Sequence, residues 1–282
     1  MFWITLVANG VAFGMLLFLI GSGLSLIFGV MRVVNLAHGS YYLIGAYLGT
    51  GVAAATNSFL LGIAAGVVAT MLLGVVMQTA FLERFGGQIL AQVLLTMGFL
   101  LLLADLSLWV WGGTPQILAI PDALSGSVRA GGFVFPRYRL FISLLSALVA
   151  LALYLVLERT RLGAQVRAAV DDPEMAQGLG VNVPRLSTAM FALGAALAGL
   201  AGVLGSPILG VFPGADLEIL TLALAVVIIG GLGSFPGTLV GSLFVGLADN
   251  IGKALFPELS YIAFFAPMAL ILAVRPRGLF GR

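Results

Sequence analysis

Few residues in this sequence belong to the types that carry out covalent or metal chemistry. The chain has no cysteine and a single histidine, His38. A disulfide framework and a thiolate metal site are therefore excluded, and one histidine cannot build a zinc or haem site alone. An enzyme would need a nucleophile with a base, or a metal cluster, and the acidic residues are too scattered to supply either. We predict that the chain is not an enzyme, has no metal site and holds no cofactor of its own.

One short stretch gathers polar side chains within otherwise apolar sequence, Asn35-Leu-Ala-His38-Gly39-Ser40. In a membrane, polar groups are tolerated only when they are paired or face a cavity, and they often mark a pathway. We therefore predict that Asn35, His38, Gly39 and Ser40 line a substrate path. The alternative is that residues 31–40 form a simple turn at the inner surface, with His38 at the interface.

Two acids lie inside apolar runs, Asp105 and Asp249. Each could pass protons, as such acids do in secondary carriers. The alternative is that they hydrogen-bond between helices or face an outer vestibule. Acids this sparse supply no convincing proton relay, so we favour the second interpretation.

The densest charge in the sequence lies in residues 158–185, and a helix start stands within it. Asp172 can accept from free backbone N–H groups, Pro173 fits a first turn, and Glu174 favours the positive end of the helix dipole. Gly178 and Gly180 offer left-handed stops soon afterwards. The sequence thus predicts a helix of about two turns.

This short helix should expose Met175, Ala176 and Leu179 at the inner surface. A helix of that length is too short to be stable alone in water, so another surface should cover it. The alternative is an ordinary solvated loop whose charges only satisfy the positive-inside rule.

The elements that must position these residues are membrane-spanning helices. Hydrophobic residues make up 61% of the chain and charged residues 9%, whereas soluble domains carry about 25% charged residues. A spanning helix needs about 20 mostly apolar residues. The apolar runs lie near 6–30, 37–56, 59–82, 89–111, 138–157, 186–206, 217–233, 237–255 and 259–274. We predict an all-α, polytopic integral membrane protein with eight or nine transmembrane helices.

The sequence predicts a single transmembrane domain, 1–282, with an outer loop at about 112–137 and an inner loop at about 158–185. Gly131 and Gly132 suggest a turn in the outer loop. Small residues let helices approach closely in lipid, so we expect most glycines within the apolar runs to serve helix packing.

A weak internal parallel suggests inverted repeats with broken helices. The run 6–30 followed by 35–40 resembles in layout the run 186–206 followed by residues 206–214. These two units would run in opposite directions. Transporters commonly bind substrate at broken helices arranged in this way.

The basic residues predict the orientation. With nine spans and the N-terminus outside, most of the 13 Lys and Arg residues fall on the inner side. The exceptions are Arg129, Arg137, Arg139 and Lys253. Trp3, Trp109 and Trp111 then lie at the outer interface, where indoles prefer to be. We expect a multi-pass protein of the bacterial inner membrane, with the N-terminus outside and the C-terminus inside.

Three stretches carry a resemblance that covers nearly the whole chain. They run from Arg161-Leu-Gly163 to Gly180-Val-Asn182-Val, from Gly23 to Ser40, and from Gly230-Gly231 to Pro236-Gly237. The first resembles the coupling loop of ABC importer permeases, and the three together resemble the branched-chain amino acid permeases. The short chain and single-domain layout look like the smaller of the two permease subunits of that family.

The resemblance implies a subunit of an importer for branched-chain or related neutral amino acids. Its implied partners are a second permease subunit, two cytoplasmic ABC ATPase subunits, an external solute-binding protein and membrane lipid. The residues that would couple to an ATPase are Arg167, Asp172, Pro173, Glu174, Met175, Ala176, Leu179 and Gly180. The chain has no G-x-x-x-x-G-K-[ST] phosphate loop, so ATP and Mg²⁺ would be bound by the partner ATPases. The net charge of +2 implies no nucleic-acid partner.

Two other functions remain open. The first is a permease for urea or short amides in the same family, because the predicted path residues suit small neutral solutes in general. The second is a stand-alone secondary carrier or channel. The lack of charged pairs at mid-membrane and the short helix that needs a covering partner argue against the second.

Overall fold

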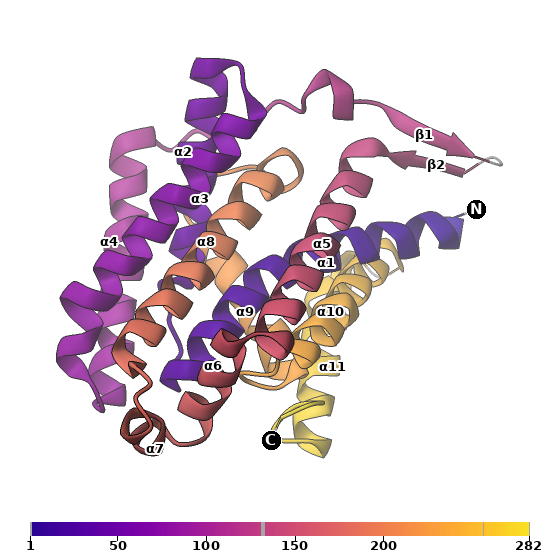
Figure 1. Ribbon diagram of the computed structural model, residues 1–282. Helices are drawn as coiled ribbons and strands as arrows, with labels where there is room; N and C mark the ends of the chain where they lie inside the picture. Colours follow the sequence, from indigo (N-terminus) through magenta and orange to yellow (C-terminus); the bar gives the residue numbers. More distant parts are fainter. Residues whose placement is uncertain (1, 131–132, 256, 282) are drawn as a thin grey trace.

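The computed structural model describes residues 2–130, 133–255 and 257–281, and these residues form a helical bundle (Figure 1). The α-helices are α1 (Phe2–Met31), α2 (His38–Thr56), α3 (Phe59–Val76), α4 (Ile89–Trp111), α5 (Arg137–Arg159), α6 (Arg161–Asp171), α7 (Pro173–Gly178), α8 (Val183–Leu209), α9 (Ala215–Gly230), α10 (Phe235–Leu255) and α11 (Ser260–Val274). A π-helical turn, η1 (Met77–Phe81), and a 3₁₀ turn, η2 (Leu82–Phe85), extend α3; η3 (Asp122–Leu124) and η4 (Pro257–Leu259) are single 3₁₀ turns.

Each of the nine predicted apolar runs falls on one of these helices, which confirms the all-α, polytopic membrane fold. Among the residues that the structure describes, five helices are long and apolar enough to cross a membrane: α1, α3 with its extension to Phe85, α4, α5 and α8. Large apolar side chains such as Leu60, Leu90 and Trp109 point outward from this group. An outward face of this kind suits lipid rather than water.

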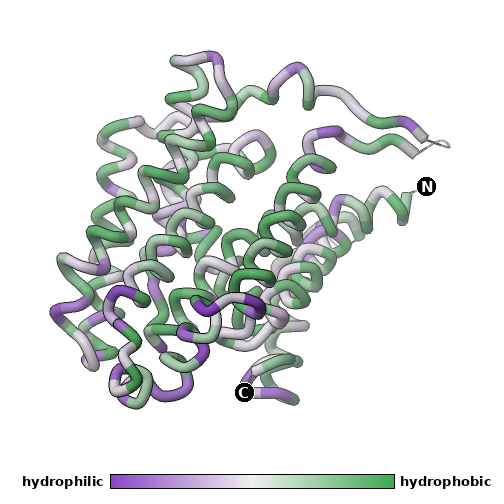
Figure 2. Tube along the Cα trace, in the orientation of Figure 1, coloured by the Kyte–Doolittle hydropathy of each residue, from purple (hydrophilic) through white to green (hydrophobic). Residues whose placement is uncertain are grey.

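The loop at 112–137 contains a feature that the sequence did not reveal, a β-hairpin. Strand β1 (Ser127–Ala130) pairs antiparallel with β2 (Phe133–Pro136), with Val128 opposite Phe135. The turn predicted at Gly131 and Gly132 lies outside the described residues. The hairpin and helix α7 lie at opposite ends of the molecule, called here the hairpin end and the α7 end (Figure 1). Figure 2 shows hydrophilic residues gathered at the α7 end.

The bundle contains two units of the same layout, α1–α2–α3 and α8–α9–α10. Helix α1 packs along α10, and in the corresponding contact α8 packs along α3. The units run in opposite directions, because Val30 near the end of α1 and Leu186 near the start of α8 share one cluster at the α7 end. The structure therefore has the inverted layout that the sequence parallel suggested.

Glycines allow the close packing of these long helices. A Cβ placed on Gly14 of α1 would lie 2.8 Å from the carbonyl oxygen of Ser242 in α10. A Cβ on Gly74 of α3 would lie 2.7 Å from the Cβ of Ala195 in α8. Real Cβ atoms do not approach so closely, so these positions exclude larger side chains. The prediction that glycines in the apolar runs serve packing is confirmed at these contacts.

Candidate functional site

The first break lies between α1 and α2. Helix α1 ends at Met31, yet the Nε2 atom of His38, the first residue of α2, lies 2.9 Å from the carbonyl oxygen of Ile20. At 1.5 Å per residue, Ile20 is about 17 Å back along α1 from its end. Residues 32–37 must therefore run back into the bundle, which an extended segment of that length can do, since it spans about 20 Å. The alternative of a simple surface turn is wrong, because His38 is fully buried at this depth.

The second break lies between α8 and α9, and it approaches from the hairpin end. Residues 210–214 lead from α8 to Ala215, which packs with Leu43 of α2 and Val211 inside the bundle. The backbone of Val211 exchanges two hydrogen bonds of 2.8 Å with Gln116, so the loop after α4 holds this linker in place. Both α2 and α9 therefore begin inside the bundle rather than at a surface.

The starts of α2 and α9 meet. Gly39 lies so close to Asp216 that an added Cβ would overlap the Asp216 carbonyl oxygen. The Ser40 hydroxyl donates to the Asp216 carboxylate, Oγ to Oδ2, at 3.5 Å. Two positive helix ends thus face each other, and the buried carboxylate of Asp216 lies between them, where negative charge is favoured. Broken helices whose N-termini meet within a membrane are the usual setting of transporter substrate sites.

The structure places all four predicted path residues at the start of α2. Asn35 is buried and its Oδ1 accepts from the backbone N–H of Ala37 at 3.1 Å. His38 donates through Nε2 to the carbonyl of Ile20, because a carbonyl oxygen can only accept. Gly39 and Ser40 contact Asp216. None of the four is among the lining residues of the cavity that opens beside this junction, so their role in a substrate path stays a prediction.

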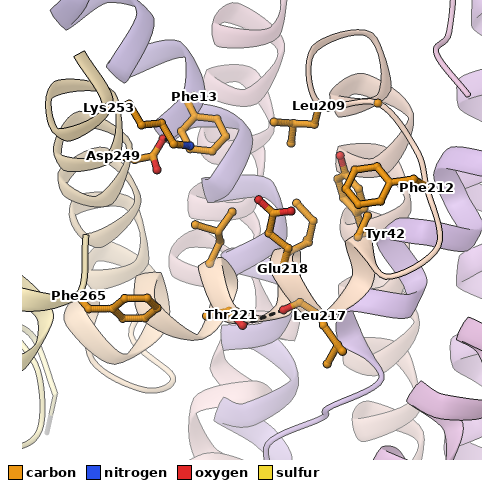
Figure 3. Close-up of a pocket in the computed structure, with 14 residues that line it drawn as sticks. Phe13, Tyr42, Leu209, Phe212, Leu217, Glu218, Thr221, Asp249, Lys253 and Phe265 are labelled. Atoms are coloured by element: carbon orange, nitrogen blue, oxygen red, sulfur yellow. Dashed lines mark hydrogen bonds and ion pairs between the residues drawn. The ribbon is translucent and has the colours of Figure 1, made fainter. Parts of the chain in front are cut away.

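A cavity of about 470 Å³ opens beside this junction (Figure 3). It lies between α1, α2, α9, α10 and α11, and its volume is in the range of about 300–1,000 Å³ that small-molecule sites occupy. Its walls are mostly apolar, and they include Leu209, Phe212, Ile219, Leu222 and Phe265.

Three charged side chains of the described residues line the same cavity. Lys253 and Asp249, one turn apart on α10, form an ion pair of 2.9 Å, and the Lys253 ammonium lies 5.9 Å from the ring centre of Phe13. Glu218 lies in the first turn of α9 and is exposed to the cavity. The sequence interpretation missed Glu218 because it treated residues 217–233 as one apolar run. The available signal was an acid four residues after the Pro213-Gly214 pair, at the start of an apolar helix.

The two acids that the sequence singled out have different places. Asp249 pairs within its own helix and lines the cavity. Asp105 is exposed on α4 and does not line it. Asp249 therefore faces a cavity, as one of the two interpretations allowed, whereas Asp105 does not line that cavity.

At the α7 end, the predicted helix start is confirmed. Asp172 is the N-cap of α7, and its Oδ1 accepts from the backbone N–H of Met175 at 2.9 Å, with Pro173 at the first position. Gly180 has a φ of +89° and ends the turn after α7. Gly178 is wrong as a left-handed stop, because it remains in the helix.

The exposure of α7 agrees with the prediction at two positions and contradicts it at one. Met175 is 62% exposed and Leu179 is 77% exposed. Ala176 was expected on the same surface, but it is 2% exposed and packs with Val166 and Ala169 of α6. Residues i and i+4 share one face of a helix, and residue i+1 is turned about 100° away. The prediction for Ala176 is therefore wrong.

The sequence analysis did not predict helix α6. Thr160 caps it, accepting from the backbone N–H of Gly163 at 3.3 Å, and its buried face packs on α7 and α8. Arg167 of α6 donates to the carbonyl of Leu157 and pairs with Glu158 at 3.4 Å. Glu174 is exposed. Arg167 thus braces the junction of α5 and α6, while Met175, Leu179 and Glu174 remain open to a partner.

The sequence is similar to those of known transport proteins. A model of the family described as branched-chain amino acid transport system, permease component, matches residues 6–272. The BraD permease protein of a high-affinity branched-chain amino acid transport system in Pseudomonas aeruginosa is 29% identical, over 97% of this chain and 94% of its own length. The LivH permease protein of Escherichia coli is 29% identical over the same shares.

Two further similarities are more distant. The LivM permease protein of Salmonella typhimurium is 28% identical over 94% of this chain and 68% of its own length. The solved structure of PsaBC from Streptococcus pneumoniae in complex with Fab has a TM-score of 0.52 and 14% identity, covering 94% of this chain and 89% of that one. That likeness concerns the fold alone. The family match over most of the sequence is decisive: the chain belongs to the permease components of branched-chain amino acid transport systems.

Proposed function

We propose that this chain is a membrane-spanning permease subunit of an ATP-binding-cassette importer for branched-chain or related neutral amino acids. The observation that carries the proposal is the family match over residues 6–272, together with relatives that are named as branched-chain amino acid permeases. The mostly apolar cavity beside the meeting point of α2 and α9 supports it, because such walls suit a neutral solute with an apolar side chain.

The proposed partners are a second permease subunit, two cytoplasmic ABC ATPases and an external solute-binding protein. The exposed side chains of Met175 in α7 and of Leu179 directly after it support an ATPase contact there, because large apolar side chains in water gain stability when a groove covers them. ATP and Mg²⁺ belong to those partners in this proposal.

The proposed location is the bacterial inner membrane, with the N-terminus outside and the C-terminus inside. The hydrophilic α7 end then faces the cytoplasm, and the hairpin end faces the binding protein. In this orientation most of the 13 Lys and Arg residues lie on the inner side of the membrane. The positive-inside rule favours such a distribution. In such a membrane the two breaks would face each other near mid-depth, one reached from each side.

Transport in this scheme alternates access to the cavity from the two sides. The residues around the two breaks can take part in this change of access. One linker ends at the start of α2 and the other at the start of α9, and these two helix starts pack against each other. ATPase movements at α7 would shift the linker of residues 32–37, and the starts of α2 and α9 would move together.

The proposal is tested by reconstituting the chain with its partner subunits in proteoliposomes. The complex should hydrolyse ATP faster when the loaded binding protein is added, and it should take up leucine only with ATP. Excess urea or acetamide should not compete with leucine. Leucine uptake by this chain alone, driven by a proton gradient, would reject the ABC assignment, and competition by urea would favour the amide permease.

A further inference from the structure

The cavity beside α9 carries an unbalanced negative charge. Its described lining has three charged side chains, and two of them, Lys253 and Asp249, neutralise each other in the pair of 2.9 Å. Glu218 makes no ion pair within the described residues. A carboxylate in a membrane-embedded helix is costly unless it faces water or a positively charged partner. Glu218 therefore marks the place in this cavity where a cation is favoured.

A second, independent polar group lies in the same wall. Tyr42 of α2 lines the cavity and is fully buried, and its hydroxyl has no hydrogen-bond partner within the described part of the chain. Buried hydroxyls are nearly always hydrogen-bonded, and leaving one unpaired is unfavourable. Tyr42 and Glu218 both line this cavity. A ligand at Glu218 would thus share the cavity with Tyr42, whose hydroxyl is buried against Gly205 of α8.

The remaining walls are mostly apolar and surround the carboxylate of Glu218. Figure 3 shows Glu218 between the ion pair of α10 on one side and Tyr42 with Phe212 on the other, and Phe265 stands farther along the cavity. An α-amino acid with a branched side chain has one ammonium group, one carboxylate and one apolar part. This cavity offers a carboxylate, a paired lysine and apolar walls.

We propose that Glu218 is a specificity-determining residue that binds the ammonium group of the transported amino acid, with the side chain of the amino acid against the apolar walls. The inference rests on the proposed function and narrows it to solutes with an ammonium group. Urea and simple amides have none, so this site disfavours them. A charge-assisted hydrogen bond to Glu218 would account for about a tenfold or larger preference.

The absence of cysteine in the natural chain permits a direct test. Thr221 lines the cavity one turn after Glu218, and its hydroxyl bonds only to the Leu217 carbonyl of its own helix at 2.8 Å. In the reconstituted complex carrying Thr221→Cys, a cationic methanethiosulfonate should label this chain faster than an anionic one. Adding Glu218→Gln should reduce that ratio of rates about tenfold or more.

Protection experiments identify the group that Glu218 binds. Leucine and leucinamide, which both have an ammonium group, should slow the labelling of Cys at position 221. The 2-hydroxy analogue of leucine should not slow it, and Glu218→Gln should abolish the protection by leucine. A matched control is Thr56→Cys at the end of α2, where the threonine is exposed and also bonds only to its own helix. Its labelling should respond neither to Glu218→Gln nor to leucine.

The outcomes separate this inference from the proposed function. Leucine uptake with equal labelling rates for both reagents, or with equal protection by the 2-hydroxy analogue, overturns the role of Glu218 and leaves the importer in place. A cysteine at position 221 that reacts in the isolated chain but not in the assembled complex also overturns it, because the partner subunit then fills the cavity. Protection by leucine without any uptake supports the site and rejects the proposed function.

Discussion

Gly39 and Asp216 are in backbone contact at the point where α2 and α9 begin. No side chain fits between them, since a Cβ on Gly39 would overlap the Asp216 carbonyl oxygen and would lie 2.9 Å from its carbonyl carbon. The residues are far apart in the sequence and belong to the two inverted units. Their contact fixes the relative position of two helix starts inside the bundle, so we expect a movement of one linker to shift the other helix as well.

The first prediction concerns Gly39→Ala. The added methyl group must push α2 and α9 apart, and overpacking of this kind costs about 1–3 kcal/mol. Leucine uptake by the reconstituted complex should fall at least tenfold, and the thermal unfolding midpoint should drop. Gly51→Ala on the same helix is the control, because no atom lies within 4 Å of a Cβ there. Equal uptake by the two variants would contradict the proposed importance of this contact.

The second prediction concerns Asn35 and His38, the residues that we expect to line the path. His38→Ala removes a buried hydrogen bond to the Ile20 carbonyl, which contributes about 0.5–1.5 kcal/mol, and leaves a void where the imidazole packs. Uptake should fall in both His38→Ala and Asn35→Ala. His38→Gln retains an N–H donor, so it should recover part of the stability, and its uptake then reports on the path itself. Unchanged uptake in both alanine variants would remove these residues from the path.

The third prediction concerns the exposed face of α7. Met175→Glu and Leu179→Glu should leave folding unchanged, because both side chains are exposed in this chain. They should abolish the stimulation of ATP hydrolysis by the loaded binding protein and weaken co-purification of the ATPases. Ala176→Glu is the contrasting variant: its side chain would enter the cluster with Val166 and Ala169, so the protein itself should be destabilised. Normal stimulation in both exposed-face variants would place the ATPase contact elsewhere.

Features determined by short stretches of sequence could be predicted well. The long helices could be predicted from the apolar runs, because the composition of a segment by itself decides whether it can span a membrane. The start of α7 was correct because an Asp-Pro-Glu sequence caps a helix through its own backbone. The break before His38 was recognisable because polar residues interrupt an apolar run, but its depth depended on the contact with Ile20.

Features determined by contacts between distant elements could not be predicted. Glu218 was hidden within an apolar run, since its exposure to a cavity results from the way α1, α10 and α11 surround α9. Ala176 was assigned to the wrong face because the packing of α6 and α8, not the sequence of α7, decides which side of a short helix is buried. The approach of Gly39 to Asp216 likewise requires both inverted units at once.

The fourth prediction concerns Arg32, which links the α7 end to the first break. Its Nη2 donates to the carbonyl of Val170, at 2.7 Å, close to the Asp172 cap of α7. Arg32 also begins the linker that leads to His38, and its φ of +55° is unusual for an arginine. In the proposed importer, we expect a movement of α7 to reach the linker through this hydrogen bond.

We expect Arg32→Gln to separate ATP hydrolysis from transport. The loaded binding protein should still stimulate hydrolysis, because α7 keeps its cap and its exposed face, but leucine uptake per ATP should fall several-fold. Arg161→Gln is the control, since Arg161 is exposed on α6 and makes no side-chain hydrogen bond or ion pair within the described residues. Both rates are measured on the same proteoliposomes. A parallel loss of hydrolysis and uptake in Arg32→Gln would mean that Arg32 supports ATPase docking and not the transmission of movement to α2.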